Sequence, residues 1–222
     1  MILSRNRAFK KEPPSRDARL FIFVCEGEKR EVQYFNYFAD LDARFAVVTL
    51  PPEAGKDHSP SGLVDRVDAY LSGSDAQLIE PIAIAESDQI WYIIDTDDWG
   101  EKIEELATKI KQHKLVSQMA VAQSNPCFEV WLCYHFLPEP QYFANFETAT
   151  AWKQHLIKIQ PGNFSALKHP ILIRDAIDAA STHYEQRDDG QPAVGSTQVF
   201  RPATTIYEAL AHKLDSTRNK SF

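Results

Sequence analysis

The sequence predicts an α/β protein: a parallel sheet of about four strands flanked by helices, followed by a helical C-terminal region. Up to residue 124, continuous apolar runs typical of strands buried on both faces alternate with amphipathic helical patterns. Beyond residue 124 only helical patterns follow. Strands separated by helices need crossover connections, which are right-handed and join parallel strands.

The elements of the first half follow in a regular order. Each expected strand is a run of apolar residues, and each expected helix has apolar residues three or four positions apart. We expect strands at 20–25, 45–50, 90–94 and 116–122, and helices at about 28–43, 63–71 and 103–110, with a surface connection at 72–88.

The second half is expected to contain a helix that begins at Asn125, because Asn125-Pro126 fits an N-cap followed by proline at the first helical position. Further helices are expected at about 146–159, 170–186 and 204–217, with a loop at 188–202. The chain therefore divides into a basic leader at 1–18, an α/β core at 19–124 and a helical region at 125–222. That last region is either an appendage or a layer packed on the core.

Composition excludes several classes of protein. The chain has 222 residues, of which 44% are hydrophobic, enough for one large domain. No apolar run approaches the roughly 20 residues that span a bilayer, and no secretory signal is seen, so we expect a cytoplasmic protein without membrane contact. The three cysteines lie in apolar segments and indicate reduced thiols rather than disulfides or a zinc site.

The net charge of −7 argues against a protein that coats nucleic acid through bulk positive charge. It leaves room for a nucleic-acid enzyme that holds metal ions on carboxylates and confines its basic residues to a local patch. The arginines and lysines of the first 19 residues are one candidate patch, and a solvated leader is the alternative interpretation.

Acidic residues follow two of the predicted strands. Glu26 comes directly after the first strand, and Asp95 and Asp97 end the third. In a parallel sheet the carboxyl ends of the strands share one edge, where ligands gather, and alternate residues of an extended segment face the same side. Three carboxylates repel one another unless a divalent cation neutralises them, and oxygen ligands suit Mg²⁺ or Mn²⁺. The pattern predicts a metal site for phosphoryl chemistry, although acids after strands also cap helices.

Other polar residues nearby are assigned accessory roles. Glu28 and Asp98 fit capping or outer contacts of the site. Asn125 and Glu129 are one turn apart on the expected helix and either extend the metal site or satisfy backbone and solvent. Lys29 and Arg30 are candidate phosphate contacts that equally suit an exposed helical turn. His135 is expected in the core or at its rim, and Cys25 is disfavoured as a nucleophile because an acidic neighbour raises a thiol pKa.

At these same positions the sequence resembles the RloB-like family. The resemblance rests on five blocks between about residues 20 and 214, which are Cys25-Glu26-Gly27-Glu28 with Glu31 and Tyr34-Phe35, Asp95-x-Asp97-Asp98-Trp99, the block from Ser124 through Asn125-Pro126-Cys127-Phe128-Glu129 to Leu132, His135-Phe136, and Pro202-Ala203-Thr204-Thr205-Ile206-Tyr207. The last block has alanine where serine is more usual. The family is associated with bacterial restriction and anti-phage loci.

The resemblance implies a Toprim-type fold with a four-stranded parallel sheet. It implies Asp95 and Asp97 as magnesium ligands, Glu26 as ligand or general acid/base, and Glu129 as an additional carboxylate. We therefore expect a Mg²⁺- or Mn²⁺-dependent nuclease that acts on DNA or RNA in anti-phage defence. The small size of the chain and its helical region favour a homodimer or a complex with a partner defence protein. The alternatives are a non-catalytic module that binds nucleic acid or nucleotide through a metal, and a nucleotidyl or phosphoryl transferase.

Overall fold

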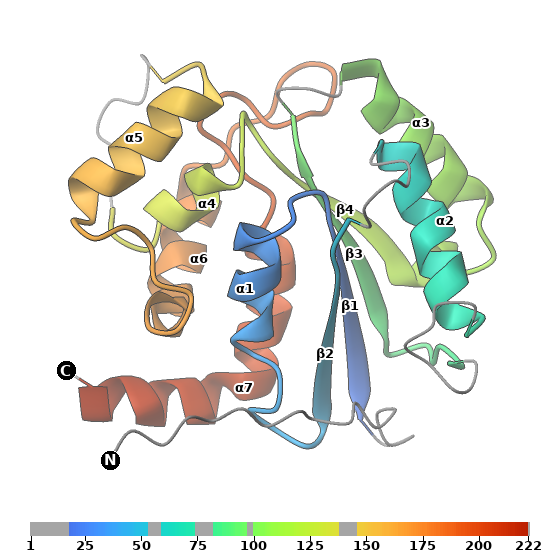
Figure 1. Ribbon diagram of the computed structural model, residues 1–222, viewed down its shortest axis with the longest axis horizontal. Coiled ribbons are helices and arrows are strands. Elements are labelled where there is room, and N and C mark those ends of the chain that lie inside the picture. Colours follow the sequence, from blue (N-terminus) through green and yellow to red (C-terminus); the bar gives the residue numbers. More distant parts are fainter. Residues whose placement is uncertain (1–17, 53–58, 74–81, 97–99, 138–145, 222) are drawn as a thin grey trace.

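A four-stranded parallel sheet forms the centre of the computed structural model, which describes residues 18–52, 59–73, 82–96, 100–137 and 146–221 (Figure 1). The strands lie in the order β2-β1-β3-β4. Their bounds are Arg19–Cys25 for β1, Phe45–Leu50 for β2, Gln89–Asp95 for β3 and Met119–Ser124 for β4. All three pairings are parallel, which confirms the predicted α/β fold class.

Helices cover both faces of the sheet, and the alternation of side chains along β1 explains how. Leu20, Ile22 and Val24 point into one core with α2 (Pro60–Leu71) and α3 (Gly100–Gln112). Phe21, Phe23 and Cys25 point into the other core. That second core is shared with α1 (Arg30–Asn36), α4 (Glu129–Cys133), α5 (Ala149–Ile159), α6 (Ile173–Thr182) and α7 (Phe200–Ser221).

The helices after residue 125 therefore form a layer on the sheet and not an appendage. Side chains of α4, α5, α6 and α7 belong to the same buried cluster as Phe21 and Phe23. His135 is buried as predicted, 4% exposed, and packs against Tyr34 and Trp131 of this cluster, with Nε2 3.2 Å from the hydroxyl of Tyr34. No helix in the described part of the chain is both long and apolar enough to cross a membrane.

In the first half, α2 and α3 each begin three residues earlier than predicted, and two other elements differ for an identifiable reason. The helix expected at 28–43 is α1, which ends at Asn36. The chain continues in tighter turns, and Asp40 adopts a positive φ of 64°, which no helix accommodates. The fourth strand begins at Met119, not Val116, because its register pairs Met119 with Ile90 of β3. Residues Val116–Gln118 form a 3₁₀ turn, η1.

The predicted helix start at Asn125 is wrong. The Asn125-Pro126 peptide bond is cis, and α4 begins only at Glu129. Asn125 instead pairs with a distant loop: its N–H donates to the carbonyl of Ser196 at 3.0 Å, and its carbonyl accepts from the N–H of Gly195 at 2.8 Å. This loop also forms an antiparallel bridge between Thr197 and Ser124, so it lies along the carboxyl end of β4.

The helices near the C-terminus also shift from their predicted bounds. The stretch expected at 170–186 is a 3₁₀ turn, η3 (His169–Leu172), followed by α6, which ends at Thr182. The last helix begins at Phe200, inside the predicted loop. Pro202 lies in its first turn, where a missing N–H leaves no helical hydrogen bond unmade.

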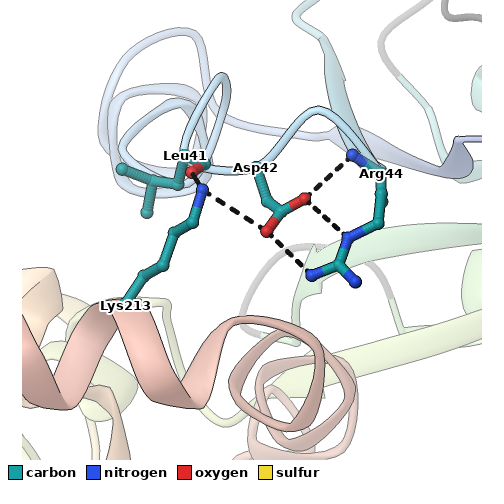
Figure 2. Close-up of polar contacts among 4 residues, drawn as sticks. All are labelled: Leu41, Asp42, Arg44 and Lys213. Carbon is teal, nitrogen blue, oxygen red and sulfur yellow. Dashed lines mark hydrogen bonds and ion pairs between the residues drawn. The ribbon is translucent and has the colours of Figure 1, made fainter.

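An ionic contact joins α7 to the connection between α1 and β2. Figure 2 shows the carboxylate of Asp42 between the guanidinium of Arg44 and the ammonium of Lys213. The Arg44 Nε lies 3.1 Å and the Lys213 Nζ 3.3 Å from an Asp42 oxygen. Lys213 Nζ also donates to the carbonyl of Leu41. Asp42 is only 8% exposed. This ionic contact holds α7 against the connection that leads into strand β2.

Candidate functional site

Glu26 and Asp95 meet at the carboxyl edge of the sheet. Asp95 is the last residue of β3, and Glu26 directly follows the neighbouring strand β1. The backbone N–H of Glu26 donates to the carbonyl of Ile93 at 3.2 Å, extending the pairing of the two strands. The backbone N–H of Asp95 donates to Oε2 of Glu26 at 2.9 Å. The order of the strands therefore brings together two acidic residues that are 69 positions apart.

Two further carboxyl groups lie buried beside this pair. Glu129, the first residue of α4, is 3% exposed, and Glu31 in the first turn of α1 is 7% exposed. Burial raises the pKa of Glu31 to about 7, and the charges of Glu129 and Glu26 add to the shift. The three glutamates are thus close enough to repel one another. The hydrogen bond of Glu31 to its own backbone N–H and the nearby Arg30 only partly offset this effect.

Gly27 permits the close approach of Glu31 to the strand end. A Cβ atom on residue 27 would lie well inside van der Waals contact of the Glu31 carboxyl. A larger residue at position 27 would push the Glu31 carboxyl out of the place that it occupies. The Glu26-Gly27 pair therefore does two things: it places one carboxylate at the end of β1 and makes room for another beneath it.

The thiol of Cys127 lies close to both Asp95 and Glu129, so these two carboxylates are near each other. Its thiol pKa is raised by burial first, and then by the charges of Glu129 and Asp95. The thiol of Cys25 likewise has a raised pKa, through burial and the charge of Glu31. Both thiols are buried and held in the neutral form, which agrees with the expectation that Cys25 is not a nucleophile.

Two arginines supply positive charge at the same edge. Arg30 forms an ion pair through Nε with Oε1 of Glu129 at 3.2 Å, and its side chain remains 38% exposed. Arg66 on α2 is 8% exposed, and its Nη1 donates to the carbonyls of Cys25 and Leu50 at 3.2 Å each. Arg66 therefore joins the carboxyl ends of β1 and β2 from the opposite face of the sheet.

Several predicted accessory roles change. The N-cap position of α1 is Lys29, no side chain caps that helix, and Glu28 is exposed, so Glu28 is not a cap. Asn125 and Glu129 do not share a helix face, because α4 starts after Asn125. The amide of Asn125 donates to the carbonyl of Pro192 at 2.8 Å, a structural contact. Asp97 and Asp98 lie outside the described residues, so the structure does not place them.

Within the described ranges, no group of three or more His, Cys, Asp or Glu side chains has the arrangement of a ready metal site. That search does not include Asp97, the third member of the predicted set. Glu31 and Arg66 were not among the candidate residues from the sequence. Glu31 could have been found as an acid on the buried stripe of α1, since Tyr34 and Phe35 follow it at helical spacing. Arg66 gave no such signal.

Comparison with known protein families decides the family. The model of the RloB-like proteins matches residues 21–212, from β1 to the middle of α7. The chain belongs to the RloB-like family. The match contains all four carboxyl groups, Arg30 and Arg66, so the carboxyl-edge cluster of this RloB-like protein lies wholly inside the family region. Among curated proteins and solved structures, no significant match is found.

Proposed function

We propose that this RloB-like protein is a metal-dependent nuclease that hydrolyses phosphodiester bonds of DNA or RNA in bacterial anti-phage defence. The observation that supports the proposal best is the contact between Glu26 and Asp95, with Glu31 and Glu129 buried directly behind them. Ligand sites of parallel α/β sheets form at this edge. The proposal includes a Toprim-type arrangement, in which Asp97 joins Asp95 as a second strand-end ligand.

The chemistry of these side chains fits a divalent cation. All the candidate ligands are carboxylates, and hard cations such as Mg²⁺ and Mn²⁺ prefer oxygen ligands. Burial contributes most to the raised pKa of Glu31, and the charges of Glu129 and Glu26 together raise it more than the charge of Arg30 lowers it. A cation bound by Glu26 and Asp95 offsets the repulsion among these carboxyl groups.

Each side chain then has a distinct task. Glu26, Asp95 and Asp97 hold the cation, which stabilises charge on the phosphate and lowers the pKa of an attacking water when bound. Glu31, with a pKa near neutrality, holds or releases a proton as the charge of the cluster changes. Arg30 is oriented by buried Glu129 and directs its exposed guanidinium toward a phosphate oxygen.

The test is cleavage of a panel of single- and double-stranded DNA and RNA with Mg²⁺ or Mn²⁺. We expect Glu26→Gln and Asp95→Asn to lower the rate by at least about a hundredfold, as loss of a principal charge-stabilising group does. The matched controls are Glu104→Gln and Asp178→Asn, the same chemical changes at exposed positions on α3 and α6, and these should cleave like wild type. Wild-type rates in both site variants would contradict the proposal. Metal-dependent nucleic-acid binding without cleavage would favour a binding module instead.

A further inference from the structure

A long segment in the helical layer of this acidic chain contains no acidic residue. Residues 148–174 include Lys153, Lys158, Lys168 and Arg174 but no aspartate or glutamate, although the whole chain has a net charge of −7. The segment comprises α5, the turn after it, and the start of α6. Charge of one sign in such a region creates a local positive field on an otherwise acidic molecule.

The outer face of α5, which we define as Lys153, Gln154, Ile157 and Lys158, is exposed to solvent. These residues recur at the spacing of one helix face. Opposite them, Trp152 and Leu156 are fully buried in the core. The side chains of Lys153 and Lys158 form no ion pair or hydrogen bond with any residue in the described part of the chain.

Some other exposed cations of the protein are already paired with an acidic side chain. Lys109 pairs with Asp65, Arg187 with Asp189, and Arg218 with Asp175. The lysines of the α5 outer face are available to a ligand, because binding an anion there does not first break an internal ion pair. Their positive charge can therefore attract an anion from solution.

The first turn of α5 lies next to the carboxyl cluster. The thiol of Cys127 contacts the carbonyl of Ala149 at 4.0 Å, and this same thiol lies in the field of Glu129 and Asp95. Figure 1 shows α4 and α5 toward the end of the molecule where the strands terminate. At a helical rise of about 1.5 Å per residue, Lys153 lies about 6 Å and Lys158 about 14 Å along α5 from Ala149.

We propose that the outer face of α5 binds the phosphate backbone of the nucleic acid that this protein cleaves. The proposal rests on the nuclease function stated above and names the surface that grips the substrate. One strand of a duplex advances about 3.4 Å per nucleotide, so the two lysines reach phosphates about two to four nucleotides from the cluster. A cluster of carboxylates repels a polyanion by itself, and an adjacent basic helix supplies the attraction that the cluster lacks.

The composition of α5 favours nucleic acid over a membrane. A helix that inserts at a membrane interface exposes several large apolar side chains. On α5, Trp152 and Leu156 are buried in the core. Ile157, 53% exposed, is the one large apolar side chain among the four residues of the outer face. Two lysines flanked by a glutamine match sequence-independent phosphate contacts, which position a nucleic acid without reading its bases.

The test is binding of a fluorescent oligonucleotide of about 20 nucleotides, DNA or RNA, followed by anisotropy at several salt concentrations in EDTA. EDTA removes metal binding and cleavage, so only the grip is measured. We expect Lys153→Glu/Lys158→Glu to weaken binding about tenfold or more. We expect Lys153→Gln/Lys158→Gln to reduce the slope of the logarithm of the binding constant against the logarithm of the salt concentration by about one for each lysine. The control Lys111→Glu/Lys114→Glu changes charge equally at exposed residues at the end of α3 and beyond it, and should bind like wild type.

Three results would overturn the proposal: equal binding by wild type and the α5 variants, an equal loss in the control, or preferential binding of phosphatidylserine vesicles over the oligonucleotide. A failure of the nuclease function looks different. In that case the oligonucleotide still binds through α5 in EDTA, but no cleavage follows when Mg²⁺ or Mn²⁺ is added. The thermal unfolding temperature of each variant separates lost binding from lost folding.

Discussion

Glu31 is a carboxyl group whose surroundings oppose its ionisation. Its pKa is raised to about 7 by burial and by the charges of Glu129 and Glu26. An unfolded glutamate has a pKa of about 4.3, so the folded state binds the proton more tightly. The stability contributed by this group is therefore fully present below about pH 4.3 and is lost as the pH rises through about 7.

We expect the free energy of unfolding, measured in EDTA, to fall between about pH 5 and pH 8 by as much as about 3 kcal/mol from Glu31 alone. Glu31→Gln mimics the protonated group, so this variant should lose that decline and be more stable than wild type at about pH 8. Urea unfolding at several pH values measures the effect. An unchanged decline in Glu31→Gln would show that Glu31 ionises freely in the folded protein.

Some residues of the cluster could be predicted from local sequence, and others could not. Glu26 and Asp95 directly follow runs of apolar residues, so strand ends and their shared edge could be derived without the structure. Arg66 lies on an amphipathic helix, where an arginine is normally solvated. Its burial depends on the carbonyls of Cys25 and Leu50, two strand ends that only the assembled sheet brings together.

At the scale of elements, the contact of α7 with the α1–β2 connection depends on Asp42. The hydrogen bonds from Arg44 hold the pKa of Asp42 well below its usual range, and Lys213 adds to the effect. A carboxylate with a lowered pKa stabilises the fold above the unfolded pKa, and this stabilisation is lost as the pH falls through the folded value.

We expect Asp42→Asn to lower the thermal unfolding temperature at neutral pH, because Arg44 and Lys213 then face each other without a negative charge between them. Wild type should approach the variant as the solution is acidified. Arg44→Gln/Asp42→Asn tests the same contact with one charge fewer and should be less destabilised than the sum of its single variants. A variant as stable as wild type at every pH would show that the ionic contact contributes nothing.

The sequence predicted an element well when the burial of its own side chains determines its bounds. It predicted an element poorly when hydrogen bonds to a distant part of the chain determine the conformation. Strand β2 has the predicted bounds, because its apolar run packs against both helical layers and is followed by Pro51. The Asn125-Pro126 dipeptide looked like a helix start because the local pattern fits one. In the structure, the backbone of Asn125 forms hydrogen bonds with Gly195 and Ser196, about 70 positions away. The sequence around residue 125 gives no sign of these distant partners.

At the scale of the whole molecule, the two halves of the chain share one core. The face of β1 that contains Phe21 and Phe23 is covered by helices that follow residue 125 as well as by α1. A fragment of residues 19–124 lacks those helices and would expose that face to water. It would lose the stabilisation from burying each such side chain, about 1.5–3 kcal/mol.

We therefore expect the 19–124 fragment not to fold cooperatively by itself, as judged by near-ultraviolet circular dichroism and thermal unfolding, whereas the full chain unfolds in one transition. A fragment with a cooperative transition of its own would show that the α/β core is an independent domain.

The central claim is that the carboxyl edge of the sheet holds a divalent cation, and isothermal titration of Mn²⁺ or Mg²⁺ into the intact protein tests it most directly. We predict saturable binding in wild type and in Asp178→Asn, and its loss in Glu26→Gln and Asp95→Asn. Binding should also release protons as Glu31 ionises, so the measured heat should change with the ionisation enthalpy of the buffer. Saturable binding that survives both site substitutions would place the cation elsewhere. An absence of binding in wild type, with and without an oligonucleotide, would contradict the claim itself.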